Sequence, residues 1–138
     1  MAGPYHHITL RLESDILILT LELEQVKDYV VAEELRYEMM HAAKRFKRKK
    51  IVVDLQNMTF MTSLACVAFI GLKAGVRDNH ARIVMCNMSE FIRKVFNAKR
   101  LLTPSQNTGS VTFEEAETLN DALARLAEPI PASEEERT

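Results

Sequence analysis

The sequence predicts an α/β fold: a mixed sheet of about four to five strands, with parallel inner strands, and about four helices. After two opening strands, segments of strand character and segments of helical character alternate, an order typical of parallel strands joined by right-handed crossovers. The chain has 138 residues, which is the size of one domain with a proper hydrophobic core. We find no internal repeat, so we expect a single domain.

Two strands are predicted at the start. Residues 8–12 (ITLRL) and 15–21 (DILILTL) alternate between apolar and polar positions, and only a short connection at Glu13 and Ser14 separates them. Strands joined so closely should pair antiparallel.

The first helix is predicted from Asp28 onward, because apolar residues now recur at steps of three and four. It ends in KRFKRKK, residues 44–50, with six cations around Phe46. The helix dipole accounts for part of this cluster. Two interpretations remain: a solvated helix end, or a docking point for an acidic partner or a phosphate. The predicted apolar stripe is Val31, Leu35, Met39, Ala42 and Phe46.

The rest of the chain is organised around residues 51–72. A strand at 51–53 leads to Asp54, a polar turn, and the neighbouring hydroxyls of Thr62 and Ser63. From Leu64 to Leu72 every residue is apolar or glycine, and the next charged residue is Lys73. Ser63 is a candidate N-cap, because its hydroxyl can accept from backbone N–H groups of the next turn. A helix that is apolar on nearly all sides should be buried. Phe69 and Ile70 are therefore expected to be packing residues.

The remaining elements follow the same alternation. ARIVMCNM (81–88) predicts an inner strand, and Ser89 is expected to cap a helix with an apolar face at Phe91, Ile92, Val95 and Phe96. Residues 101–110 are turn-rich. A short last strand is predicted at 111–113, and Thr112 and Glu115 have capping-box spacing before a closing helix. The apolar face of that helix is expected to comprise Ala116, Leu119, Leu123 and Leu126.

VVDLQNMTFMTSLACVAFIGL resembles the signature of the STAS domain, the fold of the anti-sigma factor antagonists. In this resemblance Ser63 falls on the family's phosphorylated serine, and its neighbour Thr62 is the second candidate. The sequence has Thr62, Leu64 and Ala65 where the family usually has Asp, a second Ser and Gly. The resemblance spans residues 8–127, which implies an N-terminal extension at 1–7 and an acidic, disordered tail at 128–138.

The resemblance implies a regulatory binding protein without enzymatic activity or cofactor, located in the bacterial cytoplasm. It would bind an anti-sigma factor/serine kinase of the GHKL ATPase type, release a sigma factor, and be switched by phosphorylation at Ser63, with a serine phosphatase as a further partner. A phosphate adds about −1.5 to −2 charges, which a docked partner would not tolerate. The predicted partner-binding residues are Asn57, Thr59, Thr62, Ser63 and Leu64. We expect the side chains of Asn57, Thr59 and Thr62 to be exposed, since functional loops lie at the carboxyl ends of parallel strands.

Other functions stay open on the sequence. Ser63 can be a simple N-cap in a STAS scaffold that does not switch and is a subunit of a larger complex, of a stress-signalling or lipid-transport type. The domain can also be a small ligand or nucleotide binder that uses the cleft at the ends of the parallel strands.

Composition argues against several classes of protein. The net charge of −1 disfavours a general nucleic-acid binder. Cys66 and Cys86 lie in apolar segments without metal spacing, and the adjacent His6 and His7 point to opposite sides of an extended chain, so no metal site is expected. The apolar run within 58–72 is shorter than the ~20 residues of a membrane span. We expect no membrane insertion, and a monomer or a weak homodimer.

Overall fold

A five-stranded mixed sheet organises the fold. The computed structural model describes residues 5–102 and 112–128. The strands lie in the order β1 (Ile8–Glu13), β2 (Ile16–Leu21), β4 (Lys50–Asp54), β6 (Arg82–Cys86) and β7 (Glu114–Ala116). β1 and β2 pair antiparallel, whereas β2, β4, β6 and β7 pair parallel. The predicted mixed sheet with parallel inner strands is therefore confirmed.

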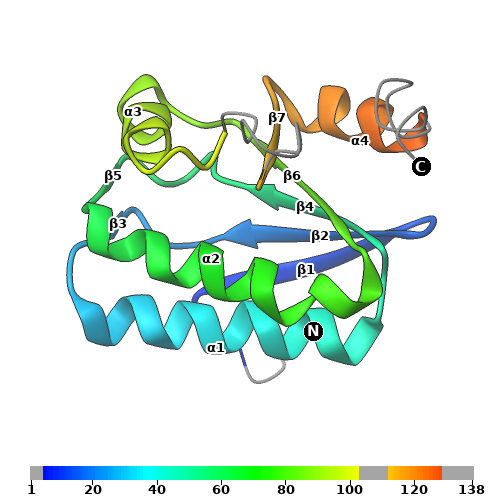
Figure 1. Ribbon diagram of the computed structural model, residues 1–138, viewed down its shortest axis with the longest axis horizontal. Coiled ribbons are helices and arrows are strands. Elements are labelled where there is room, and N and C mark those ends of the chain that lie inside the picture. The colour runs from blue at the N-terminus through cyan, green and yellow to red at the C-terminus, as the bar shows by residue number, and fades with distance from the viewer. Residues whose placement is uncertain (1–4, 103–111, 129–138) are drawn as a thin grey trace.

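The helices form layers on both faces of this sheet. Four α-helices lie within the described residues: α1 (Tyr29–Phe46), α2 (Cys66–Gly75), α3 (Glu90–Ala98) and α4 (Leu119–Ala127). Figure 1 shows α1 and α2 side by side on one face and α4 on the other. Leu17, Leu19 and Val53 belong to the core on the α1 and α2 side, whereas Ile18, Val52 and Val84 pack with Ala122 and Leu126 of α4. Burial on both faces explains why the inner strands are apolar at successive positions.

The two opening strands and the first helix form as their local patterns predict. Ser14 turns the β1–β2 hairpin with φ 57°. Oδ1 of Asp28 accepts a hydrogen bond from the Val31 N–H over 2.9 Å, which caps α1. The helix ends where Lys47 adopts φ 50° and donates its N–H to the Ala43 carbonyl. The predicted stripe of α1 is buried at Leu35, Met39 and Ala42 and half-buried at Val31 and Phe46.

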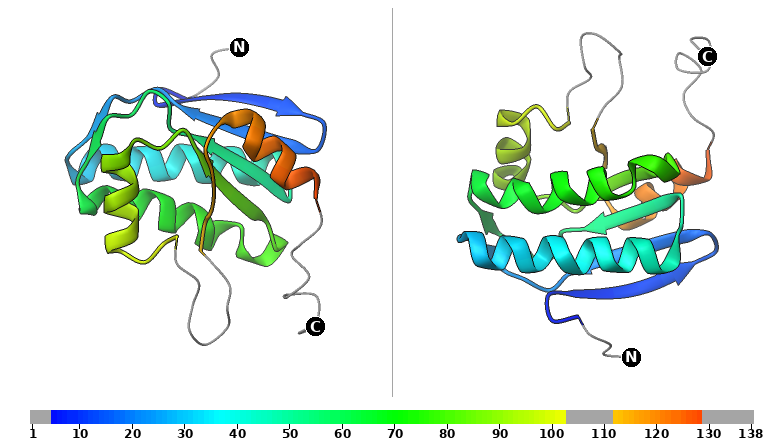
Figure 2. Two further views of the ribbon diagram at one scale, coloured as in Figure 1. Left: turned by 90° about the horizontal axis from the view of Figure 1, so that it is seen from above. Right: turned by 60° about the horizontal axis from the view of Figure 1, so that its bottom comes forward.

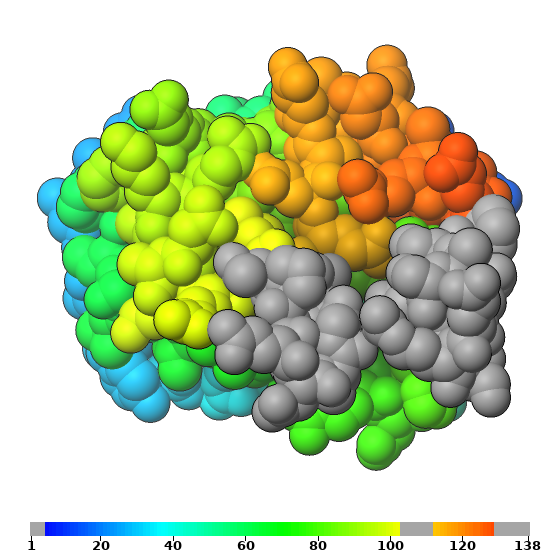
Figure 3. All heavy atoms as spheres, turned by 45° about the horizontal axis from the view of Figure 1, so that its top comes forward, coloured from blue at the N-terminus to red at the C-terminus, as the bar shows by residue number. Residues whose placement is uncertain are grey.

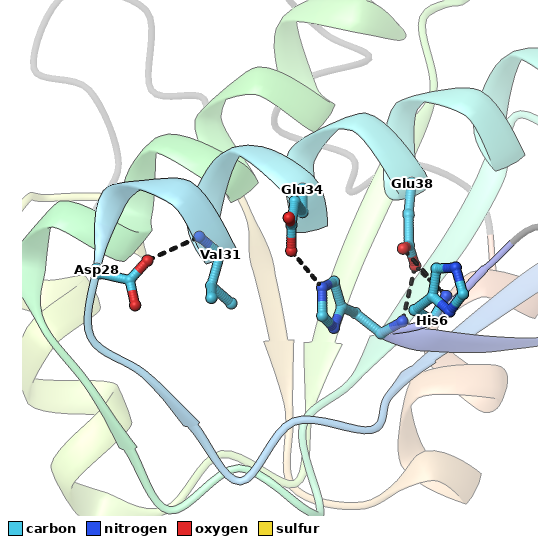
Figure 4. Close-up of polar contacts among 6 residues, drawn as sticks. His6, Asp28, Val31, Glu34 and Glu38 are labelled. Carbon is cyan, nitrogen blue, oxygen red and sulfur yellow. Dashed lines mark hydrogen bonds and ion pairs between the residues drawn. The ribbon is translucent and has the colours of Figure 1, made fainter.

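A buried carboxylate ties the start of β1 to α1. Glu38 is only 6% exposed, and its oxygens accept from the backbone N–H of His6 at 3.1 and 3.0 Å and from that of His7 at 2.8 Å. Nε2 of His7 also lies 2.9 Å from Oε1 of Glu34. Figure 4 shows both glutamates facing the entering chain from one side of α1. These contacts hold the open edge of the sheet on the helix layer.

The C-terminal elements differ from the prediction. The strand is Glu114–Ala116 and not 111–113, of which Val111 lies outside the described residues. Its pairing with β6 makes Glu114, Glu115 and Ala116 part of the sheet, so Glu115 does not begin a helix. The N-cap of α4 is Thr118, whose hydroxyl accepts from the Asp121 N–H over 3.1 Å. The predictions of a capping box at Thr112 and of a helical position for Ala116 were therefore wrong.

The C-terminal segment also contacts α3. Arg93 of α3 forms an ion pair with Glu115 of β7, and Figure 3 shows α3 and the β7–α4 segment on one face of the molecule. Regular structure runs from Ile8 to Ala127, while most of the turn-rich stretch 101–110 and of the tail 128–138 lies outside the described residues. The domain bounds of 8–127 thus stay a prediction. No helix in the described ranges is long and apolar enough to cross a membrane.

Candidate functional site

The site begins where β4 ends. The Asp54 side chain is buried, and its Oδ1 accepts from the Gln56 N–H over 3.0 Å and from Nδ2 of Asn87 over 2.9 Å. The Leu55 N–H donates to the Cys86 carbonyl over 3.0 Å. Because these bonds join the ends of β4 and β6, the turn at 56–57 rests on a rigid base.

A second small sheet, which the sequence analysis missed, holds the next part of the loop. β3 (Gln25–Val26) pairs parallel with β5 (Phe60–Met61). On either side of β5, the Thr59 N–H donates to the Glu24 carbonyl and the Thr62 N–H to the Val26 carbonyl, over 2.8 and 3.1 Å. Strands of two residues are too short to show an alternating pattern, so the sequence carries no clear signal for them.

Asn57 and Thr59 contribute side-chain bonds to the same attachment. Nδ2 of Asn57 donates to the Leu21 carbonyl and to Oε1 of Glu22, both over 3.2 Å. The Thr59 hydroxyl donates to the Glu24 carbonyl over 3.4 Å. Both residues are exposed, as predicted. The loop is thus bonded to the segment that follows β2 and still presents polar groups to solvent.

The two hydroxyls behave differently from each other. A 3-10 helix, Ser63–Ala65, precedes α2, and its N-cap is Thr62, which makes no side-chain capping bond. The expectation that Ser63 is the N-cap was wrong, because the tight turn pairs the Ala65 N–H with the Thr62 carbonyl over 3.0 Å. Ser63 is exposed. Thr62 was expected to be exposed, but its Oγ1 is buried and finds no hydrogen-bond partner among the described residues.

The helix that follows is buried on one side only. Cys66, Ala68, Phe69 and Leu72 of α2 are buried, whereas Ile70 is 45% exposed. The prediction that Ile70 is a packing residue was therefore wrong. Leu64, in the 3-10 turn before α2, is 47% exposed. α2 lies beside α1 in the helix layer on one face of the sheet (Figure 2), so one side of it packs on its neighbours and the other faces solvent despite its apolar sequence.

An aromatic pair extends this surface toward α3. Phe60 of β5 stacks on Phe91 of α3, with ring centroids 5.1 Å apart and planes at 21°. Phe91 was expected in the buried face of its helix, but it is 45% exposed. The predicted cap of α3 is confirmed, since the Ser89 hydroxyl accepts from the Ile92 N–H over 3.1 Å. Figure 1 places β5, the start of α2 and α3 at the same end of the sheet.

We call Asn57, Thr59, Thr62, Ser63 and Leu64 the loop face. None of these residues is charged, and the nearby carboxylate of Asp54 is buried. Burial raises the pKa of the Cys66 thiol. Burial, and secondarily the charge of Asp54, raises the pKa of Cys86 to about 12. Both thiols therefore stay protonated near neutral pH. Among the described residues, no group of three or more His, Cys, Asp or Glu side chains could hold a metal ion.

A family model described as the STAS domain matches residues 7–103. The chain belongs to the STAS family. The match includes the whole loop face and the first three helices. As a STAS domain, the chain carries its loop face on the connection between an inner parallel strand and the helix after it.

Solved structures of similar proteins show the same fold. An anti-sigma factor antagonist from Mycobacterium paratuberculosis has a TM-score of 0.71 and 15% identity, covering 88% of this chain and 93% of that one. The anti-sigma factor antagonist SpoIIAA in its unphosphorylated form has a TM-score of 0.65 and 18% identity, covering 90% and 99%. RsbS of Moorella thermoacetica has a TM-score of 0.67 and 12% identity, covering 87% and 94%. Identities this low establish the shared STAS fold alone.

Proposed function

We propose that this STAS domain is an anti-sigma factor antagonist. It binds an anti-sigma factor with serine kinase activity, of the GHKL ATPase type, and so releases a sigma factor. Phosphorylation at Ser63 ends the binding, and a serine phosphatase restores it. Membership of the STAS family supports this proposal, as does the likeness to SpoIIAA and to the mycobacterial antagonist.

The observation that carries the proposal is the state of Ser63. The residue is exposed, it lies in the first turn before α2, and no hydrogen bond joins its hydroxyl to another described residue. A phosphate on this oxygen therefore breaks no structural contact. Its charge of about −1.5 to −2 would also lie near the positive end of the helix dipole. The modified domain stays folded.

The same phosphate weakens the binding of a partner that docks on the loop face. The loop face is uncharged, and its exposed Leu64, together with Phe91 of α3, offers apolar area to a protein surface. A phosphate inserted there must lose its hydration, and without a cation opposite it that loss costs binding free energy. Phosphorylation thus releases the partner.

Phosphate transfer tests the proposal directly. The full chain is incubated with ATP and the purified GHKL-type anti-sigma factor kinases of the source organism, and the modified residue is mapped by mass spectrometry. We expect phosphate on Ser63 and none in Ser63→Ala. Thr59→Ala, which alters an exposed hydroxyl on the same loop, should remain a substrate. Modification confined to residues other than Thr62 and Ser63 contradicts the proposed switch.

A scaffold that does not switch is the second candidate, and the side chain of Thr62 favours it. The neutral, buried hydroxyl of Thr62 occupies the position where a carboxylate is expected from the family pattern. If that carboxylate helps a kinase to recognise the serine, its loss weakens phosphorylation and leaves docking intact. A partner that binds wild type and Ser63→Asp with equal affinity, together with no phosphate transfer, supports the scaffold.

A further inference from the structure

A dense positive surface lies at the opposite end of β4 from the loop face. Six cations lie within residues 44–50, which form the end of α1 and lead into β4. We call these six residues the basic cluster: Lys44, Arg45, Lys47, Arg48, Lys49 and Lys50. Among the described residues, the acidic side chain paired with this cluster is Asp15, whose Oδ2 lies 3.3 Å from Nζ of Lys50. Lys44, Arg45, Lys47 and Lys49 are exposed. Most of the positive charge therefore has no counter-charge in the described part of the chain.

Local structure accounts for only part of this cluster. The carbonyl end of the helix dipole favours Lys44 and Arg45 in the last turn of α1. Arg45 also lies over the Phe46 ring, with its guanidinium carbon 5.0 Å from the centroid. Nη1 of Arg48 donates to the Phe46 carbonyl over 2.9 Å, but its Nε is buried without a partner among the described residues. Lys47 and Lys49 have no such local role, and clustered cations attract anions.

The described chain ends beside this surface. Nη1 of Arg82 donates to the Glu128 carbonyl over 3.0 Å, just after α4. Arg82 of β6 stands opposite Lys50 of β4 in the parallel register, and its N–H donates to the Lys49 carbonyl over 2.8 Å. Figure 1 shows that α1 and α4, although they lie on opposite faces, end at the same end of the sheet. One arginine thus contacts both the exit of α4 and the basic cluster.

The sequence after Glu128 carries charge of the opposite sign. Residues 129–138 read PIPASEEERT, with three consecutive glutamates at 134–136. An extended chain spans at most ~3.3–3.6 Å per residue, so six residues from Glu128 to Glu134 can cover roughly 20 Å. Neighbouring strands are only about 4.8 Å apart, so this reach includes the lysines that lead into β4.

We propose that Glu134, Glu135 and Glu136 dock on the basic cluster of their own chain. The attachment at Glu128 keeps these carboxylates at a high effective concentration near Lys47 and Lys49, an advantage that a free anion lacks. The contact is electrostatic and exposed, so it weakens as salt shortens the range of the charges. An outside anion must displace the glutamates before it can reach the cluster. Because the loop face lies at the other end of β4, this contact leaves Ser63 accessible.

Spin labelling of the full chain tests this contact. Cys66 and Cys86 are 2% and 0% exposed, so in Ser133→Cys a thiol-reactive nitroxide should attach beside the glutamates. In nuclear magnetic resonance spectra we expect the amide signals of 44–50 to broaden and those of 57–63 to stay sharp. The matched control carries Glu134→Gln, Glu135→Gln and Glu136→Gln, which keep the chain length and remove the charge. Raising the salt from 0.1 to 1 M shortens the Debye length from about 10 to about 3 Å, and it should restore the signals as the glutamine control does.

Three outcomes overturn the proposal. Sharp signals at 44–50 in labelled Ser133→Cys at low salt mean that the glutamates do not reach the cluster, which then stays free for an outside anion. Equal broadening in the glutamine control means that charge does not hold the contact. The last experiment mixes spin-labelled chains with unlabelled, isotopically enriched chains, so that broadening can arise only between two copies. Broadening in the enriched chains that matches the single-chain result means that the glutamates of a second copy occupy the cluster.

Discussion

Asn87 donates its side-chain N–H to Oδ1 of Asp54 over 2.9 Å, and this bond joins the carboxyl ends of two neighbouring parallel strands. Asn87 reaches this position with φ 57°, and its backbone N–H donates to the Glu117 carbonyl after β7. One asparagine thus connects the ends of β4, β6 and β7. The loop face depends on this connection, because the backbone N–H of Gln56, in the turn before it, also donates to Oδ1 of Asp54.

Asp54→Ala should lower the free energy of unfolding by about 1–3 kcal/mol, because it leaves the donors of Gln56 and Asn87 without their acceptor at a buried position. Urea denaturation followed by circular dichroism measures the change. Asp15→Ala is the matched control, since the Asp15 side chain is 63% exposed, and we expect a change within about 0.5 kcal/mol. Equal effects of the two variants would show that the Asp54 bonds do not hold the turn.

Ser63→Asp should weaken binding of the anti-sigma factor partner by roughly tenfold or more, about 1.4 kcal/mol, because it introduces a carboxylate into an uncharged interface. Ser63→Ala should bind as wild type does. Lys47→Glu combined with Lys49→Glu should have the smaller effect, since these lysines lie at the other end of β4. Isothermal titration calorimetry with the purified partner decides between the two surfaces. Loss of binding in the lysine variant alone would move the interface to the basic cluster.

Phe69 and Ile70 are adjacent in α2 but differ in burial, at 0% and 45% exposed. Phe69 packs on Phe96 with ring centroids 5.2 Å apart, so Phe69→Ala should cost about 3–5 kcal/mol. Ile70→Ala removes a half-exposed side chain and should cost less than about 1 kcal/mol. Denaturant melts of both variants give the comparison. If Ile70→Ala lowers the free energy of unfolding nearly as much as Phe69→Ala does, the Ile70 side of α2 is also packed, which contradicts the exposure of Ile70.

The Cys86 thiol should make stability fall at alkaline pH. Its pKa is about 12 in the folded chain against an ordinary value of 9.0. Between these values the unfolded chain loses the proton and the folded chain keeps it, so the free energy of unfolding decreases as pH rises. Below pH 9 the contribution is fully present. Cys86→Ala should therefore show a shallower decline between pH 9 and 12 in urea melts. Parallel declines in the two proteins would mean that the thiol titrates normally.

Local patterns in the sequence were enough to predict much of the fold. The Asp28 cap, the stripe of α1, the Ser89 cap and the paired opening strands depend on side chains within a few positions of one another, and all four are confirmed. The apolar inner strands also follow from the sequence, because burial on both faces requires apolar residues at successive positions. Of the three loop side chains expected to be exposed, Asn57 and Thr59 are exposed, whereas the hydroxyl of Thr62 is buried.

Contacts between segments that are distant in the chain decided the features that local patterns did not predict. Thr62 and Ser63 have similar side chains, but the β3–β5 pairing and the 3-10 turn bury the hydroxyl of Thr62 and expose Ser63. Glu115 has capping-box spacing, yet parallel pairing with β6 places it in a strand. The composition of α2 could not tell which side faces solvent, because that depends on where the sheet and α1 lie. The sequence by itself determined the four helices, the long strands β1, β2, β4 and β6, and their order, because each has a local pattern of its own. Contacts between distant segments determined the short strands and which groups of the loop face reach solvent.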